Sequence, residues 1–225
     1  MSMLQYSAPE WIHAFSVGKE ESFVLTDDGS FVPPAGAWGV CLPLQIHSAN
    51  VVWATEAGRP ADADAVVTDV PGLCVAVKTA DCVPVLIYTD GAHPVVAAVH
   101  AGWRGTAARI VQKTLERISE AASLTSWEEC HAIIGPSISQ DSFEVGDEVY
   151  DAFRRAGFPM ERIAVRQNKW HIDLWEANRI LLEEMGVRDI RVAGVDTKKS
   201  PDWYSARRET INTGRNYNAI FFLPS

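Results

Sequence analysis

Four short apolar segments rich in β-branched residues follow one another between residues 64 and 99, and they constrain the fold more than any other feature. Such segments, separated by turn residues, are typical of strands. An Asp-Gly pair between the last two predicts a tight reversal and hence an antiparallel hairpin. The mostly continuous apolar runs predict strands covered on both faces. The four predicted strands are 64–70 (DAVVTDV), 73–78 (LCVAVK), 83–89 (VPVLIYT) and 94–99 (PVVAAV).

Helical periodicity appears only after this strand-rich region. Apolar residues at helical spacing predict helices over 105–122, 147–156 and 173–185. The third has the clearest boundaries, because Asp173 and Glu176 form a capping-box-like start and a glycine follows its last residue. Since some strands are linked by hairpins and others by helices, the sequence predicts an α+β fold rather than a regular doubly wound one. The later strands are expected at 131–135, 189–194 and 217–223.

No internal repeat or flexible linker divides the 225 residues, so we expect a single domain over residues 1–225. A formal net charge of -9 without a basic run argues against a nucleic-acid-binding surface. No apolar run approaches the ~20 residues that a membrane-spanning helix needs. The first residues lack the basic region and apolar core of a secretion signal, so a cytoplasmic location is expected. The number of chains in the assembly stays open.

Two histidines and one cysteine are candidate metal ligands, although they lie far apart in the chain. His47 lies in PLQIHSANVVW, Cys82 in TADCVPVL and His100 in AVHAGWRGT. Imidazole and thiolate bind zinc or copper, and three protein ligands would leave a fourth position open, as in catalytic zinc sites. Residues 82 and 100 bracket the predicted reversal near residue 91 almost symmetrically, so they could face each other. No compact zinc motif has this spacing, which leaves open the alternative of a buried thiol and ordinary histidines.

Several sequence blocks occur in the order found in one bacterial family. The chain resembles the laccase-domain, or multicopper-polyphenol-oxidase-like, family, whose members are now usually described as purine nucleoside phosphorylases and also as peptidoglycan editing factors. The resemblance covers roughly residues 40–223, and TADC and HAGWRGT are its most distinctive blocks. The blocks are QIHSANVVW, DADAVVTD, VKTADCVPVLIY, AAVHAGWRGTAARIV, IGPSISQDSFEVGDEV, WHIDLWEANRILLEEMGV and YSARRETINTGRNYNAIFF.

The resemblance implies a zinc centre whose ligands fall on His47, Cys82 and His100, with copper as the alternative metal. It also implies an α+β fold with mixed β-sheets packed between helices. The implied reaction is phosphorolysis of adenosine, inosine, guanosine and methylthioadenosine, and adenosine deamination is also attributed to the family. The expected partners are therefore small molecules, a purine nucleoside and phosphate.

The chain departs from the family pattern in two places. Residues 1–40 are short and lack the family's Gly-rich segment and Asn-Leu…His stretch, which makes this N-terminal part divergent and puts one wall of the substrate pocket in question. A Cys-Thr pair usual near the last strands is replaced by Asp196-Thr197. That cysteine is not among the implied ligands, so the metal site should survive its absence.

The proposed reactions need a proton carrier and a phosphate site. Asp81, next to Cys82, is the first candidate for the proton carrier, although neighbouring strand residues point to opposite faces and Asp81 reaches the metal side only if the strand is distorted. Asp64 is the second candidate, and an exposed or turn-capping role is the simpler interpretation for it. Three arginines are candidates for phosphate binding, because guanidinium groups match phosphate oxygens. These are Arg104, Arg208 and Arg215.

Three other functions remain as alternatives. A cysteine hydrolase or amidase that edits peptidoglycan precursors would use Cys82 as nucleophile and His100 or His47 as base. A copper-dependent polyphenol oxidase matches the family's older description, but a four-copper cluster needs more histidines than the six that the chain contains. A metal-stabilised binding domain without activity is the third alternative, and an open coordination position argues against it.

Overall fold

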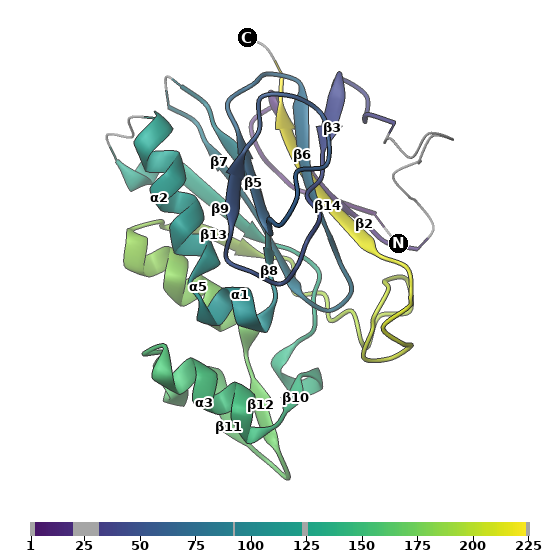
Figure 1. The fold of residues 1–225 in the computed structure, drawn as a ribbon, viewed down its shortest axis with the longest axis vertical. Coiled ribbons are helices and arrows are strands. Elements are labelled where there is room, and N and C mark those ends of the chain that lie inside the picture. Colours follow the sequence, from purple (N-terminus) through teal and green to yellow (C-terminus); the bar gives the residue numbers. More distant parts are fainter. Residues whose placement is uncertain (1–2, 20–31, 92, 123–125, 224–225) are drawn as a thin grey trace.

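The computed structural model describes residues 3–19, 32–91, 93–122 and 126–223. Within them, two stacked sheets lie on one side of a layer of helices (Figure 1). The six-stranded sheet has the order β13 (Asp189–Val192), β9 (Cys130–Ile134), β7 (Val83–Thr89), β8 (Val96–Ala101), β5 (Ala65–Thr68) and β4 (Val51–Trp53). The five-stranded sheet has the order β1 (Met3–Gln5), β2 (Ile12–Val17), β14 (Asn216–Phe222), β6 (Leu73–Thr79) and β3 (Gly39–Cys41).

One face of the six-stranded sheet is covered by α1 (Trp103–Ala107), α2 (Ile110–Ala122) and α5 (Leu174–Met185), and the five-stranded sheet covers the other. Two further helices, α3 (Asp147–Arg155) and α4 (Met160–Ile163), pack against α1 and α5 respectively. A small third sheet lies beside α3 and consists of β10 (Glu144–Val145), β12 (Trp170–Ile172) and β11 (Ala164–Arg166). Both large sheets are mixed, since β4–β5, β9–β13 and β3–β6 pair in parallel and the other neighbours are antiparallel. The predicted α+β fold with mixed sheets is confirmed.

The alternation of side chains along β7 shows why its sequence is apolar throughout. Val85 and Ile87 belong to the core between this sheet and the helices, whereas Leu86 and Tyr88 belong to the core between the two sheets. All four are at most 1% exposed. Consecutive strand residues point to opposite faces, so a strand covered on both faces must be apolar at both. The prediction from the continuous apolar runs is confirmed.

The predicted hairpin exists, but its register differs from the symmetric arrangement expected. Strands β7 and β8 are antiparallel, and Pro84 pairs with His100. Strand β8 continues through His100 to Ala101, beyond the predicted end at residue 99. Cys82 therefore falls opposite Gly102 when the register is extended by one pair beyond Val83 and Ala101. The nearly symmetric bracketing predicted for residues 82 and 100 is therefore wrong by one pair, because the reversal is centred one residue later, whereas both residues do lie at the same end of the hairpin.

The single helix predicted over 105–122 is two helices separated by a turn. Arg109 lies in this turn with a left-handed backbone, φ 63°. Its guanidinium donates hydrogen bonds to Gln112 and Glu184, each at 2.8 Å, and these tie the turn to α5. The chain turns so that α1 can lie at the end of β8 while α2 packs along the sheet. Helical spacing alone does not reveal the break, because apolar residues continue through it.

The start of α5 agrees with prediction in one of its two capping interactions. Asp173 accepts a hydrogen bond from the backbone N–H of Glu176 at 2.9 Å, and Gly186 ends the helix at φ 100°. The carboxylate of Glu176 instead pairs with Arg162. None of the helices in the described part of the chain combines the length and apolarity needed to cross a bilayer.

Candidate metal centre

The structure brings together the three residues proposed as metal ligands. His47 lies in the loop before β4, Cys82 in the turn between β6 and β7, and His100 next to the end of β8. One donor atom from each residue lies within 4.8 Å of the others. The two imidazole rings meet edge to face, with centroids 4.9 Å apart. His100 is buried, Cys82 is half-buried and His47 is exposed, so the cluster opens to solvent on the His47 side.

Asp64 holds two of the three ligands in place. Its fully buried carboxylate contacts Nδ1 of His100 at 2.7 Å and accepts hydrogen bonds from the backbone N–H groups of His47 and Ser48 at 3.0 and 2.6 Å. The Ser48 hydroxyl donates to the same carboxylate at 2.6 Å. Because Nδ1 of His100 is engaged, Nε2 is the nitrogen left for a metal, an arrangement common around metal-binding histidines. Asp64 caps the turn, as expected, but it is buried and also orients a ligand.

Two glycines of the HAGWRG block make room for the cluster. A Cβ on Gly102 would lie 3.1 Å from Sγ of Cys82 and 3.3 Å from Cδ2 of His47. A Cβ on Gly105 would lie 2.9 Å from the carbonyl oxygen of Ser48. Both glycines therefore permit the loop that carries His47 to approach the end of β8. The sequence analysis did not assign them this function, although two glycines flanking Trp-Arg next to a candidate ligand were a signal.

Opposing effects act on the Cys82 thiol. Burial alone would raise its pKa, but the neighbouring His100 and His47 outweigh burial and lower the pKa to about 6. Thiolate is the form of cysteine that binds metals, so the imidazoles favour the ligating form. The donor set, the Nε2 of His100 that faces Cys82 and the space left by Gly102 together fit a metal ion bound by three protein ligands. The cluster could hold a metal, and its chemistry suits zinc or copper.

A cleft of about 240 Å³ opens over the cluster. Its walls come from the loop before β4, the end of β6 and the segment before β14. Besides the three candidate ligands, it is lined by Gln45, Lys78, Thr79, Ala80, Ala206, Ile211 and Arg215. Three protein ligands at the floor of an open cleft are typical of a catalytic metal site rather than of a closed structural one.

Asp81 has the backbone distortion that the sequence analysis required, but its carboxylate is directed to other partners. Its φ is 88°, in the left-handed region. One carboxylate oxygen accepts a hydrogen bond from the Thr197 hydroxyl and the other from the backbone N–H of Arg207, both at 2.7 Å. Asp81 thereby fixes the two late segments that flank the cleft. It does not line the cleft.

The three candidate phosphate ligands occupy different environments. Arg215 lines the cleft, and its guanidinium donates to backbone carbonyls of its own loop, including that of Ile211 at 2.9 Å. Arg208 does not line the cleft, because its guanidinium donates to several backbone carbonyls, including those of Thr197 and Ser200. Arg104 is exposed, lies 4.3 Å from the ring centroid of its neighbour Trp103, and is likewise outside the cleft lining.

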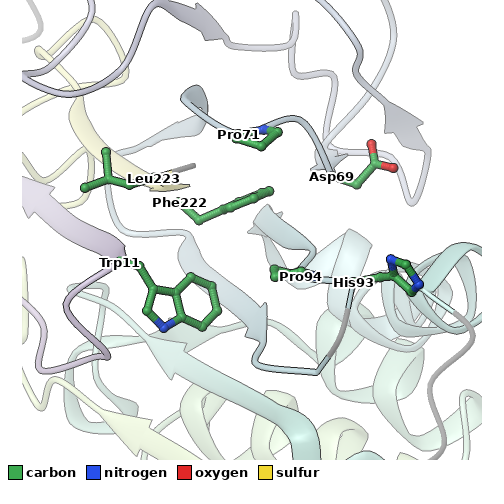
Figure 2. Close-up of a pocket in the computed structure, with 7 residues that line it drawn as sticks. All are labelled: Trp11, Asp69, Pro71, His93, Pro94, Phe222 and Leu223. Carbon is green, nitrogen blue, oxygen red and sulfur yellow. The ribbon is translucent and has the colours of Figure 1, made fainter. Parts of the chain in front are cut away.

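A larger cavity, about 400 Å³, lies at the opposite end of the β7–β8 hairpin. Figure 2 shows the rings of Trp11 and Phe222 among Pro71, Pro94 and Leu223, with Asp69 and His93 to one side. The two aromatic rings meet edge to face with centroids 6.4 Å apart. No candidate ligand or arginine from the sequence analysis lines this cavity, so the predicted chemistry belongs to the smaller one.

An α+β fold with a His–Cys–His cluster at the floor of an open cleft defines the class of this protein as a candidate metalloenzyme. The sequence profile of the family described as multi-copper polyphenol oxidoreductase laccase matches residues 16–223, and the chain belongs to that family. Within the described residues, only one group of three or more His, Cys, Asp or Glu side chains is arranged so that it could hold a metal ion. The word multi-copper therefore comes from the family description only, because the described part of the chain contains no second candidate group of this kind.

Several relatives of this chain have nucleoside-related names. A purine nucleoside phosphorylase of Bacteroides thetaiotaomicron is 45% identical over 195 residues, which cover 80% of this chain and 72% of that protein. An adenosine deaminase from an unknown prokaryotic organism is 38% identical over 198 residues, 80% of this chain and 74% of that one. A crystal structure of a Neisseria meningitidis protein, 32% identical, covers both chains fully with a TM-score of 0.82. The names of the first two relatives support a role in nucleoside processing, and the crystal structure supports the fold.

Proposed function

We propose that the chain is a zinc-dependent purine nucleoside phosphorylase, acting on adenosine, inosine, guanosine or methylthioadenosine. The observation that carries this proposal is the convergence of His47, Cys82 and His100 at the floor of an open cleft. Relatives named purine nucleoside phosphorylase, 45% and 41% identical to this chain, support the reaction class.

In phosphorolysis, a phosphate oxygen forms a bond to C1′ of the ribose while the bond between C1′ and the purine nitrogen breaks. The purine leaves with the bonding electrons and takes up a proton, and ribose 1-phosphate is formed. Positive charge in the cleft binds the phosphate, and Arg215 contributes to it from a loop fixed by its own hydrogen bonds. A bound zinc ion would act as a Lewis acid at the floor of the cleft.

The remaining residues of the site position these groups. Asp64 fixes the ring of His100 and the turn of His47, so the ligand atoms are held before a metal binds. Asp81 acts as a positioning residue, because it joins the turn of Cys82 to the segments around Thr197 and Arg207. Ile211, whose side chain is 72% exposed at the cleft, provides apolar surface for a purine ring.

Metal analysis combined with product identification tests the proposal. We expect about one zinc per chain, and release of hypoxanthine with ribose 1-phosphate from inosine only when phosphate is present. Removing the metal with a chelator should stop the reaction, and adding zinc should restore it. If chelation leaves turnover intact while alkylation of Cys82 stops it, the cysteine-hydrolase alternative replaces this one. Oxygen uptake with phenols only after copper loading would support the oxidase.

Adenosine deamination is a second candidate activity, favoured by the relative named adenosine deaminase at 38% identity. It requires water rather than phosphate as the second reactant. Formation of inosine and ammonia from adenosine in phosphate-free buffer would demonstrate it. Formation of adenine alone, and only with phosphate, would leave phosphorolysis as the sole reaction.

A further inference from the structure

One lysine in the cleft over the His47–Cys82–His100 cluster is unusual, because it interrupts a strand that is otherwise buried. Lys78 lies in β6, where every other residue is buried. Its neighbours in this strand form the cores on either side of the sheet, whereas Lys78 lies at the end of the strand and lines the cleft beside Cys82 and His100. A half-buried lysine in an otherwise buried strand carries a desolvation cost, which a bound anion would offset.

The backbone around Lys78 is fixed, but its ammonium group is not paired. The side chain of Gln45 bonds both the N–H and the carbonyl of Lys78, at 2.9 and 2.8 Å. These bonds attach the loop that leads to His47 to the end of β6. Within the described residues, the ammonium group has no hydrogen-bond or salt-bridge partner. The guanidinium groups of Arg208 and Arg215, in contrast, donate hydrogen bonds to backbone carbonyls.

The charges near Lys78 are positive. Burial, followed by the nearby Arg59 and Arg215, lowers the pKa of Lys78 below its ordinary value. Lys78 and Arg215 line the same cleft, on a chain whose formal net charge is -9. This local excess of positive charge on an acidic protein marks the cleft as an anion site.

We propose that Lys78 binds the inorganic phosphate co-substrate, in the cleft that it lines together with the candidate metal ligands and the fixed guanidinium of Arg215. The ammonium group supplies N–H donors that can rotate to follow the phosphate oxygens as the bond to C1′ forms. Arg215 has most of its donors bound to backbone carbonyls, so it contributes mainly through its charge. The inference rests on the proposed phosphorolysis, and it assigns to Lys78 the contact that the sequence analysis gave to Arg104 and Arg208.

The test compares Lys78→Met and Lys78→Arg with the wild-type enzyme containing its bound metal. Lys113→Met, an exposed position on α2 away from the cleft, is the matched control. With inosine saturating, we expect Lys78→Met to raise the KM for phosphate roughly 10- to 100-fold, the loss typical of a hydrogen bond to a charged group. The KM for inosine at saturating phosphate should change less than about threefold. Lys78→Arg should recover most of the phosphate affinity, and Lys113→Met should match wild type.

Separate outcomes distinguish failure of this inference from failure of the proposed function. An unchanged KM for phosphate in Lys78→Met, or an equal rise in KM for inosine, overturns the assignment of Lys78 while leaving phosphorolysis in place. If the wild type shows no phosphorolysis, the proposed function fails, and calorimetric titration with orthophosphate still tests Lys78. Equal phosphate affinity in wild type and Lys78→Met then overturns the assignment. Weakened binding of adenosine monophosphate with unchanged orthophosphate binding overturns it too, because the anion would belong to a nucleotide.

Discussion

The two ends of the β7–β8 hairpin carry different cavities on the same rigid strands. At one end, the His47–Cys82–His100 cluster lies under a polar cleft of about 240 Å³. At the other, beyond Pro94 and about 20 Å of strand away, a cavity of about 400 Å³ is lined mainly by aromatic and proline residues (Figure 2). The larger cavity has the greater volume. The smaller one contains the converging donor atoms and the ammonium group of Lys78, which has no partner among the described residues. Volume alone would select the end that lacks the candidate ligands.

The ends also differ in how the backbone is held. Near the metal cleft, His47 and Asp81 both have left-handed backbones, at φ 60° and 88°. Such conformations are unfavourable for residues other than glycine and persist only where surrounding contacts impose them. Here the carboxylates of Asp64 and Asp81 provide those contacts. Buried carboxylates therefore maintain the strained backbone at the end that carries the candidate ligands.

The largest expected effect comes from removing a ligand. Cys82→Ala or His100→Ala should reduce bound zinc from about one per chain to near zero and abolish phosphorolysis, because two remaining ligands hold zinc poorly. Metal analysis and product release measure this. Cys130→Ala, which removes a buried cysteine of β9 outside the cluster, is the matched control and should retain metal. Retention of zinc and turnover in Cys82→Ala would show that the end with the cluster is not the metal site.

A smaller loss is expected from Asp64→Asn. The amide keeps the size of the side chain but cannot accept all the hydrogen bonds from the turn at residues 46–48 and still orient His100. We expect metal affinity or activity to fall about 10- to 100-fold. Chelator competition measures the affinity, and a thermal melt of the metal-bound protein reports the fold. Wild-type affinity in this variant would mean that the ligands are positioned without Asp64.

Gly102→Ala should weaken metal binding more modestly. Its backbone, φ -63° and ψ 166°, accommodates alanine, so the fold should be retained. The added Cβ would crowd Sγ of Cys82 and the ring of His47, and we expect roughly a tenfold loss of zinc affinity, within the range seen when ligands are displaced. Chelator competition checks it, with an unchanged melting temperature of the metal-free protein as the control. Unchanged affinity would show that the cluster relaxes around a Cβ.

The smallest effect on activity is expected at the opposite cavity. Trp11→Ala removes half-buried aromatic surface that packs against Phe222, and should destabilise the fold by about 1–3 kcal/mol. Bound zinc and both KM values should match wild type, because Trp11 lies at the far end of the strands. Denaturant unfolding and steady-state kinetics measure the two effects. A changed KM for inosine or phosphate would mean that the two ends are coupled.

Family resemblance and structure contributed differently to the metal site. The residues alone left a buried thiol and ordinary histidines as an alternative, and the resemblance named His47, Cys82 and His100. The structure then showed that their donor atoms converge. It also showed that the guanidinium of Arg208 donates to backbone carbonyls and that the ammonium group of Lys78 has no partner among the described residues. Neither fact can be read from a basic residue in a sequence. The carbonyls that accept from Arg208 belong to residues as far away in the chain as Thr197, and tertiary packing brings them to the guanidinium.

By itself, the sequence determined the strands around residues 64–99, the main helices and the α+β class, because those depend on local apolar periodicity and turn residues. Only the tertiary structure decided the hairpin register, the break at Arg109 and the burial of Asp64. The contacts of Asp64 depend on β5 lying between β4 and β8, which brings the loop of His47 and the end of β8 to one carboxylate. Strand order is set by packing across the whole core, and no local stretch of sequence encodes it.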